Sequence, residues 1–162
     1  MKKFNYTQEE ADRLLYMKKW FSESHSFSLP PWSKKHGADE AHLSYPIVGE
    51  DDSKFKTTIR TCGEKEDTRY YNVTLIDNNN NYPIARMDTG KQSHFNKHTL
   101  ECIKGPHVHI YDAKTWERTY TIDELLGHHD NTAQYVKAFW NHFRIETDNI
   151  SIIGDLFDGQ IT

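Results

Sequence analysis

The chain has 162 residues, of which 36% are hydrophobic and 13% aromatic, and its formal net charge is −4. This length is typical of one domain, and it is sufficient to bury a core. No apolar run approaches the roughly 20 residues of a membrane-spanning helix, and no secretory signal follows the first lysines. A negative charge disfavours extensive binding to duplex nucleic acid. We therefore expect one cytoplasmic α+β domain over residues 1–162.

The N-terminal region is predicted to begin with a helix. Thr7 and Glu10 form a capping box, in which a side-chain oxygen and a carboxylate satisfy the free N–H groups of the first turn. Apolar residues follow at helical spacing, and this stripe consists of Ala11, Leu14, Met17 and Phe21. Residues 22–41 are expected to form a loop, because Pro30 and Pro31 cannot continue a helix.

The middle of the chain is typical of strands. Alternating or β-branched segments predict them over residues 43–48, 55–61, 69–77, 82–88 and 107–111. The Asn78–Asn81 run predicts a turn, because Asn tolerates positive φ, and residues 89–106 are expected to form a long polar loop. A short helix is predicted over residues 122–126. A second helix is predicted to be capped by Asn131 or Thr132 and to have an apolar face that extends to Phe143. Residues 150–157 fit either a strand or a helix. The predicted fold is α+β, with an antiparallel sheet of about five strands packed by an N-terminal and a C-terminal helix.

Two of these strands carry polar side chains at alternate positions. Because successive side chains of a strand point to opposite faces, Arg86 and Asp88 share one face, and so do His107, His109 and Tyr111. If the two strands are neighbours, all five side chains gather on one face, while Val108 and Ile110 point into the core. The intervening loop brings two candidate binding residues above this face, His94 and Asn96.

Such a face suits metal-independent cleavage of RNA. Alternate residues of a strand lie roughly 7 Å apart, so His107 and His109 can act as acid and base on either side of a phosphodiester. Arg86 can neutralise the phosphate, and Asp88 and Tyr111 can orient the histidines. The sequence offers only short basic patches for RNA, at residues 18–19 and 34–35. This hypothesis needs no metal and no cofactor.

Two other hypotheses use the same residues. In the first, His107 and His109 bind a metal, and Asp88 or His94 completes a three-ligand site of a metal-dependent hydrolase. Jelly-roll metal enzymes place a Glu shortly after such a histidine pair, whereas Glu117 is too distant in the sequence, so no metal ligand is assigned. In the second, the histidines are ordinary surface residues, and the Arg86–Asp88 ion pair contributes less than about 1 kcal/mol.

Three segments together resemble an uncharacterised family of short bacterial and phage proteins. They are Arg86-Met87-Asp88, His94-Phe95-Asn96 and the run from Pro106 to Tyr111, which match an Arg-x-Asp strand, a His-x-Asn loop and a Pro-His-x-His-x-Tyr strand. The resemblance implies no activity, but it implies mobile genetic elements and host-defence conflict. A toxin-like endoribonuclease of a toxin–antitoxin pair fits that setting, with RNA as partner. So does a non-enzymatic, anti-CRISPR-like inhibitor that covers the basic nucleic-acid-binding surface of a defence nuclease such as Cas9.

Overall fold

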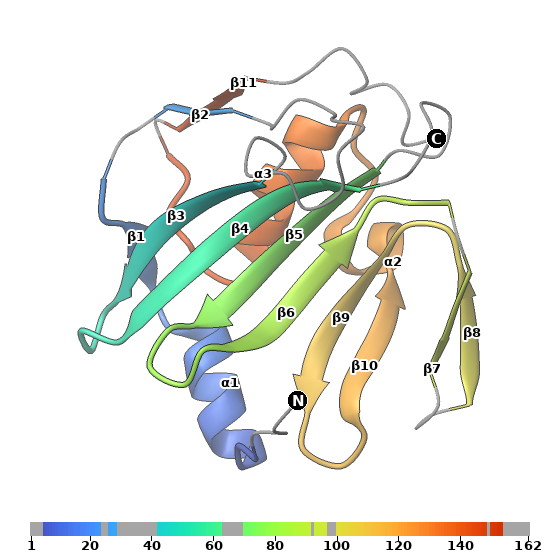
Figure 1. Cartoon of the computed structure of the whole chain (residues 1–162), viewed down its shortest axis with the longest axis horizontal. Helices are drawn as coiled ribbons and strands as arrows, with labels where there is room; N and C mark the ends of the chain where they lie inside the picture. The colour runs from blue at the N-terminus through green and yellow to red at the C-terminus, as the bar shows by residue number, and fades with distance from the viewer. Residues whose placement is uncertain are drawn as a thin grey trace.

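The computed structural model describes residues 5–23, 26–28, 42–62, 70–91, 93–96, 100–148 and 150–153. Among these residues, seven strands form one antiparallel sheet in the order β1-β3-β4-β5-β6-β9-β10 (Figure 1). The strands are β1 (Lys19–Phe21), β3 (His42–Gly49), β4 (Lys54–Cys62), β5 (Tyr70–Asp77), β6 (Tyr82–Asp88), β9 (His107–Asp112) and β10 (Trp116–Thr121). The α+β class and the antiparallel sheet are therefore confirmed, and the sheet is larger than the expected five strands.

Three helices occur in the described part of the chain: α1 (Gln8–Tyr16), α2 (Ile122–Leu126) and α3 (Thr132–His142). The capping box at Thr7 and Glu10 is present. Figure 1 shows α1 and α3 behind the large sheet, against one of its faces. There Trp140 of α3 is fully buried and donates a hydrogen bond from its indole N–H to Thr57 Oγ1 of β4 at 3.0 Å. The hydrophobic core thus lies between these helices and one face of the sheet. None of the described helices is long and apolar enough to cross a membrane.

The first helix ends earlier than its apolar stripe predicts. α1 stops at Tyr16, Met17 is its extended C-cap residue, and Phe21 lies in β1 instead of on the helix. The expected basic patch at residues 18–19 is also wrong, because the Lys19 side chain is 0% exposed. Its ammonium group donates to the carbonyl oxygens at the ends of two helices, those of Leu15, Met17 and Phe143. The other patch, at residues 34–35, lies outside the described residues.

The expected loop over residues 89–106 contains a hairpin. It is formed by β7 (Ser93–Asn96) and β8 (Glu101–Lys104), which lie beside β10 at one end of the large sheet (Figure 1). Sequence reasoning also missed β10, which follows β9 after a short turn. Part of the predicted loop over residues 22–41 forms β2 (Ser26–Ser28), which pairs in parallel with β11 (Ser151–Ile153). Residues 154–157 of the tail lie outside the described residues.

Candidate functional site

The site lies on the face of the sheet opposite α1 and α3. β6 and β9 are neighbours, and their register places Arg86 opposite His109 and Asp88 opposite His107. Directly opposite residues share a face of the sheet. The residues between them, Ala85, Met87, Val108 and Ile110, are buried in the core. The alternation predicted from the sequence therefore holds for both strands.

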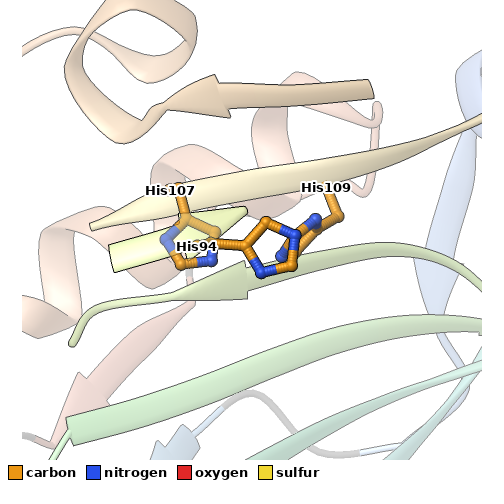
Figure 2. Close-up of side chains that lie close together, drawn as sticks. All are labelled: His94, His107 and His109. Carbon is orange, nitrogen blue, oxygen red and sulfur yellow. The ribbon is translucent and has the colours of Figure 1, made fainter. Parts of the chain in front are cut away.

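The β7–β8 hairpin adds a third histidine to this face. The ring of His94, from β7, stacks on that of His107 with centroids 5.3 Å apart and meets that of His109 edge-on at 4.4 Å. Figure 2 shows the three imidazoles close together. One ring nitrogen from each lies within 4.8 Å of those of the other two. We call His94, His107 and His109 the histidine cluster.

The hydrogen bonds of His107 fix which of its nitrogens carries hydrogen. Nδ1 lies 2.8 Å from the carbonyl oxygen of Gly105, which can only accept, so Nδ1 is the donor. Nε2 lies 3.3 Å from Asp88 Oδ2. Burial alone would lower the pKa of His107, but the hydrogen bonds to Asp88 and Gly105 raise it above its usual value. Nε2 therefore faces a carboxylate, which suits either a proton or a metal cation on that nitrogen.

The two ring nitrogens of His109 differ in their hydrogen bonding to the described residues. Its Nδ1 lies 3.2 Å from Thr119 Oγ1 and 3.3 Å from Glu117 Oε1, both on β10. An ionised Glu117 can only accept, which favours the tautomer with the hydrogen on Nδ1, and in that tautomer Nε2 keeps its lone pair. This Nε2 is buried and has no hydrogen-bond partner among the described residues. A carboxylate on one nitrogen and a free lone pair on the other is the arrangement of histidines that ligate metals.

His94 shows the same feature. Its Nε2 is also buried without a hydrogen-bond partner in the described part of the chain, and it lies 3.7 Å from Glu117 Oε1. Burial and the neighbouring His109 and His107 lower the pKa of His94, so its ring is neutral at pH 7. An orphaned buried nitrogen is costly, because it loses water without gaining another partner.

Two carboxylates border the cluster, Asp88 and Glu117. Burial alone would raise the pKa of Asp88, but hydrogen bonds from His107 and Asn72 and the charge of Arg86 lower it. Asp88 Oδ2 lies 3.8 Å from His109 Nε2 and 3.5 Å from Arg86 Nε. The hydrogen bond from His109 lowers the pKa of Glu117. Both groups are therefore ionised at neutral pH.

The exclusion of Glu117 on the basis of its distance along the sequence is wrong. The β9–β10 pairing sets Glu117 opposite Tyr111 and Thr119 opposite His109, so both share the face of the cluster. A sequence signal for this hairpin exists. The segment Trp116–Thr121 contains two Thr, a Tyr and a Trp, which favour strands, and it directly follows the strand of the His-x-His pair.

Two predicted site residues have other contacts. The Tyr111 hydroxyl is buried and forms hydrogen bonds with the backbone N–H and carbonyl of Tyr6, both at 3.0 Å. Asn96 is buried at the end of β7, and its amide donates to the Glu117 carbonyl oxygen at 3.2 Å. Tyr111 therefore anchors the segment before α1, and Asn96 anchors the hairpin that carries His94. The Tyr111 contact does not reach the imidazoles, whereas Asn96 also donates at 3.4 Å to Thr119 Oγ1, which lies 3.2 Å from His109 Nδ1.

Two hollows flank the site. A hollow of about 150 Å³ is bordered by Arg86, His109 and Glu117 together with aromatic side chains that include Tyr82 and Trp116. A larger one, of about 630 Å³, is bordered by residues of β8, β10 and α2, among them Thr119. The smaller hollow is the one lined by a residue of the histidine cluster, His109, together with Arg86 and Glu117, so we relate it to the chemistry of the site.

The comparison with known protein families covers both the site and the fold. A family model matches residues 6–145, a range that contains the large sheet and the three residues of the histidine cluster. The chain belongs to a family of unknown function (DUF6978). This result confirms the expected membership of an uncharacterised family. No curated protein and no solved structure matches the chain.

Proposed function

We propose that this member of DUF6978 is a metal-dependent hydrolase in which His94, His107 and His109 bind one divalent first-row metal ion such as Zn²⁺. The supporting observation is the pair of buried Nε2 atoms, on His94 and His109, that have no hydrogen-bond partner among the described residues. Neutral imidazole is a common ligand of zinc, copper, iron and nickel. A metal would satisfy both nitrogens and remove the cost of burying them.

The spacing of the cluster also favours a metal. Zinc–nitrogen bonds of about 2.0–2.1 Å place tetrahedral ligands roughly 3.4 Å apart. The ligand atoms already lie within 4.8 Å of one another, so small side-chain rotations suffice to close the site. By contrast, the ring centroids of His107 and His109 are only 4.7 Å apart, and the two residues are 6% and 3% exposed. This compact, buried pair leaves little room for a phosphodiester between an acid and a base.

The carboxylates supply what hydrolysis requires besides the metal. Asp88 Oδ2 lies 3.3 and 3.8 Å from the Nε2 atoms of His107 and His109, within reach of the same ion. A bound metal lowers the pKa of its water from that of bulk water to about 7. Glu117 is ionised, partly exposed and borders the smaller hollow, so it can accept a proton from that water.

Titration of the metal-free protein with Zn²⁺ or Mn²⁺, followed by calorimetry, tests this proposal. We expect about one ion per chain and loss of binding in His107→Ala and His109→Ala. His128→Ala is the matched control, because His128 is exposed and pairs with Asp123 away from the cluster. Unchanged binding in the two cluster variants, or no binding by the native chain, would contradict the metal site.

The hydrolase activity is tested with chromogenic carboxylic and phosphoric esters, with and without a chelator. We expect turnover that a chelator stops and added metal restores. RNA is included in the panel, because RNA cleavage that persists with chelator would support the metal-independent ribonuclease hypothesis instead.

A further inference from the structure

Arg86 is the cation next to the histidine cluster, and it has unused hydrogen-bonding capacity. It lies directly opposite His109 on the neighbouring strand. Its Nε is buried and has no hydrogen-bond partner within the described residues, and its ion pair with Asp88, at 3.5 Å, is longer than a hydrogen bond. Its side chain is 40% exposed. An arginine of this kind is able to offer paired N–H donors to an oxyanion from outside the protein.

Arg86 also borders the hollow of about 150 Å³ that His109 and Glu117 line. Pockets that enclose whole drug-sized ligands measure roughly 300–1,000 Å³. A hollow of this size therefore accommodates one small group beside the cluster, while the rest of a larger molecule stays outside. The lining brings that group against Arg86 and against His109, one of the three proposed metal ligands.

The charges around the hollow favour an anion once the metal is bound. A divalent ion and Arg86 would contribute three positive charges, against the two carboxylates of Asp88, which pairs with Arg86, and Glu117, which lines the hollow. A phosphate group has several charged oxygens, so it can contact the metal through one and Arg86 through two others. In phosphoryl transfer, negative charge is spread over these oxygens in the transition state, where a metal and an arginine stabilise it most.

We infer that the substrate carries a phosphate ester, and that Arg86 holds this phosphate beside the metal. The inference rests on the proposed hydrolase function and narrows its substrate class. In the reaction, the oxygen of a water molecule would bond to phosphorus while the bond between phosphorus and the ester oxygen breaks. A metal held by the histidine cluster would supply the acidity of that water. Glu117 takes one proton from the water and returns it to the departing alkoxide. The products are an alcohol and a phosphate with one ester bond fewer.

Phosphate binding to the metal-loaded protein tests the inference. Inorganic phosphate is titrated into the zinc-loaded native chain, into Arg86→Gln and into the control Arg118→Gln, and the zinc content of each is measured alongside. Arg118 is a suitable control, because it is exposed and pairs with Asp112 instead of with the cluster. We expect Arg86→Gln to bind phosphate about tenfold more weakly or worse, with its zinc retained, and Arg118→Gln to behave like the native chain.

Each other outcome overturns a distinct claim. If native protein binds zinc but not phosphate, or binds acetate as tightly as phosphate, the substrate class is wrong and the metal site stands. Equal phosphate binding by native protein and Arg86→Gln would also overturn it. If Arg86→Gln loses zinc, Arg86 serves to position Asp88 at the metal and is not the phosphate ligand. If the native chain binds no zinc, the hydrolase proposal and the inference fail together.

Discussion

Two buried polar centres lie on opposite faces of the sheet, and they differ in how their hydrogen-bonding groups are satisfied. Behind the sheet, the Lys19 ammonium donates to three carbonyl oxygens at 2.7, 3.0 and 2.9 Å. In the histidine cluster, two of the three imidazoles have a buried Nε2 without a hydrogen-bond partner among the described residues. Buried polar groups in proteins are nearly always paired. The difference suggests that the Lys19 centre is a structural contact, whereas the histidine cluster is arranged for a ligand.

The largest expected effect is at the Lys19 centre. Burial and the nearby charge of Arg144 lower the pKa of Lys19 to about 7, and its side-chain nitrogen donates to three carbonyl oxygens. Lys19→Met leaves these carbonyls without their donor, so we expect a loss of about 2–4 kcal/mol in the free energy of unfolding. Denaturation in urea measures it. Lys18→Met is the exposed control and should change stability by less than about 0.5 kcal/mol. Equal stability of the two variants would contradict the claim that the Lys19 hydrogen bonds stabilise the fold.

Metal binding at the histidine cluster should increase the free energy of unfolding by about as much as Lys19→Met decreases it. A ligand that binds only the folded state stabilises it by about 2.7 kcal/mol at 100 times its dissociation constant. We expect thermal unfolding of the native chain to move upward with Zn²⁺ and to return with a chelator. The midpoint of Lys19→Met should rise by a comparable amount, because its cluster is intact. If no divalent metal changed the unfolding temperature of the native chain, metal binding could not explain the buried, unpaired nitrogens of the histidine cluster.

The dependence of stability on pH should differ between metal-free and metal-loaded protein. Asp88 raises the pKa of His107 in the folded, metal-free protein above the unfolded-state pKa of 6.5. The ion pair between the two residues therefore stabilises the fold fully below pH 6.5. This stabilisation is lost as the pH rises through the folded-state pKa. The stability difference between native protein and His107→Gln should therefore shrink as the pH rises above the unfolded pKa of 6.5. With zinc the trend reverses, because protons compete with the metal for imidazole. Parallel pH curves with and without zinc would contradict this assignment.

The smallest stability effect is expected for His94→Phe in metal-free protein. Phenylalanine supplies an aromatic ring in place of the imidazole and removes the orphaned Nε2. The free energy of unfolding should therefore stay within about 0.5 kcal/mol of the native value or increase. The same variant should lose the stabilisation by zinc. His128→Phe serves as control and should keep it. A large loss of metal-free stability in His94→Phe would mean that the imidazole already has a structural role.

The sequence predicts the parts of the site that depend on local periodicity. Alternation along Ile84–Asp88 and His107–Tyr111 assigns Arg86, Asp88, His107 and His109 to one face, because strand geometry fixes the side of each residue. The position of His94 depends on the β7–β8 hairpin, and the polar composition of this segment predicts a loop instead of strands. Glu117 and Thr119 reach the cluster only through the β9–β10 register. Such pairings are contacts between strands, so no single segment encodes them.

The limits of α1 also depend on a contact that local periodicity does not predict. The apolar spacing that continues to Phe21 is compatible with a longer helix, yet the chain turns at Met17 so that Lys19 can reach carbonyl groups of α1 and of residue 143. Here a tertiary contact overrides local periodicity. The predicted RNA partner, the anti-CRISPR-like inhibitor function and a cytoplasmic location depend on encounters outside the fold, and they stay predictions.

Anomalous diffraction from crystals of the zinc-loaded protein tests the metal site most directly. The account predicts one strong zinc peak on the sheet face, with nitrogens of His94, His107 and His109 at roughly 2.0–2.1 Å from it. It also predicts Asp88 beside the ion and His109 Nδ1 still paired with Glu117. A peak elsewhere, or no peak with the three rings packed on one another as before, would contradict it.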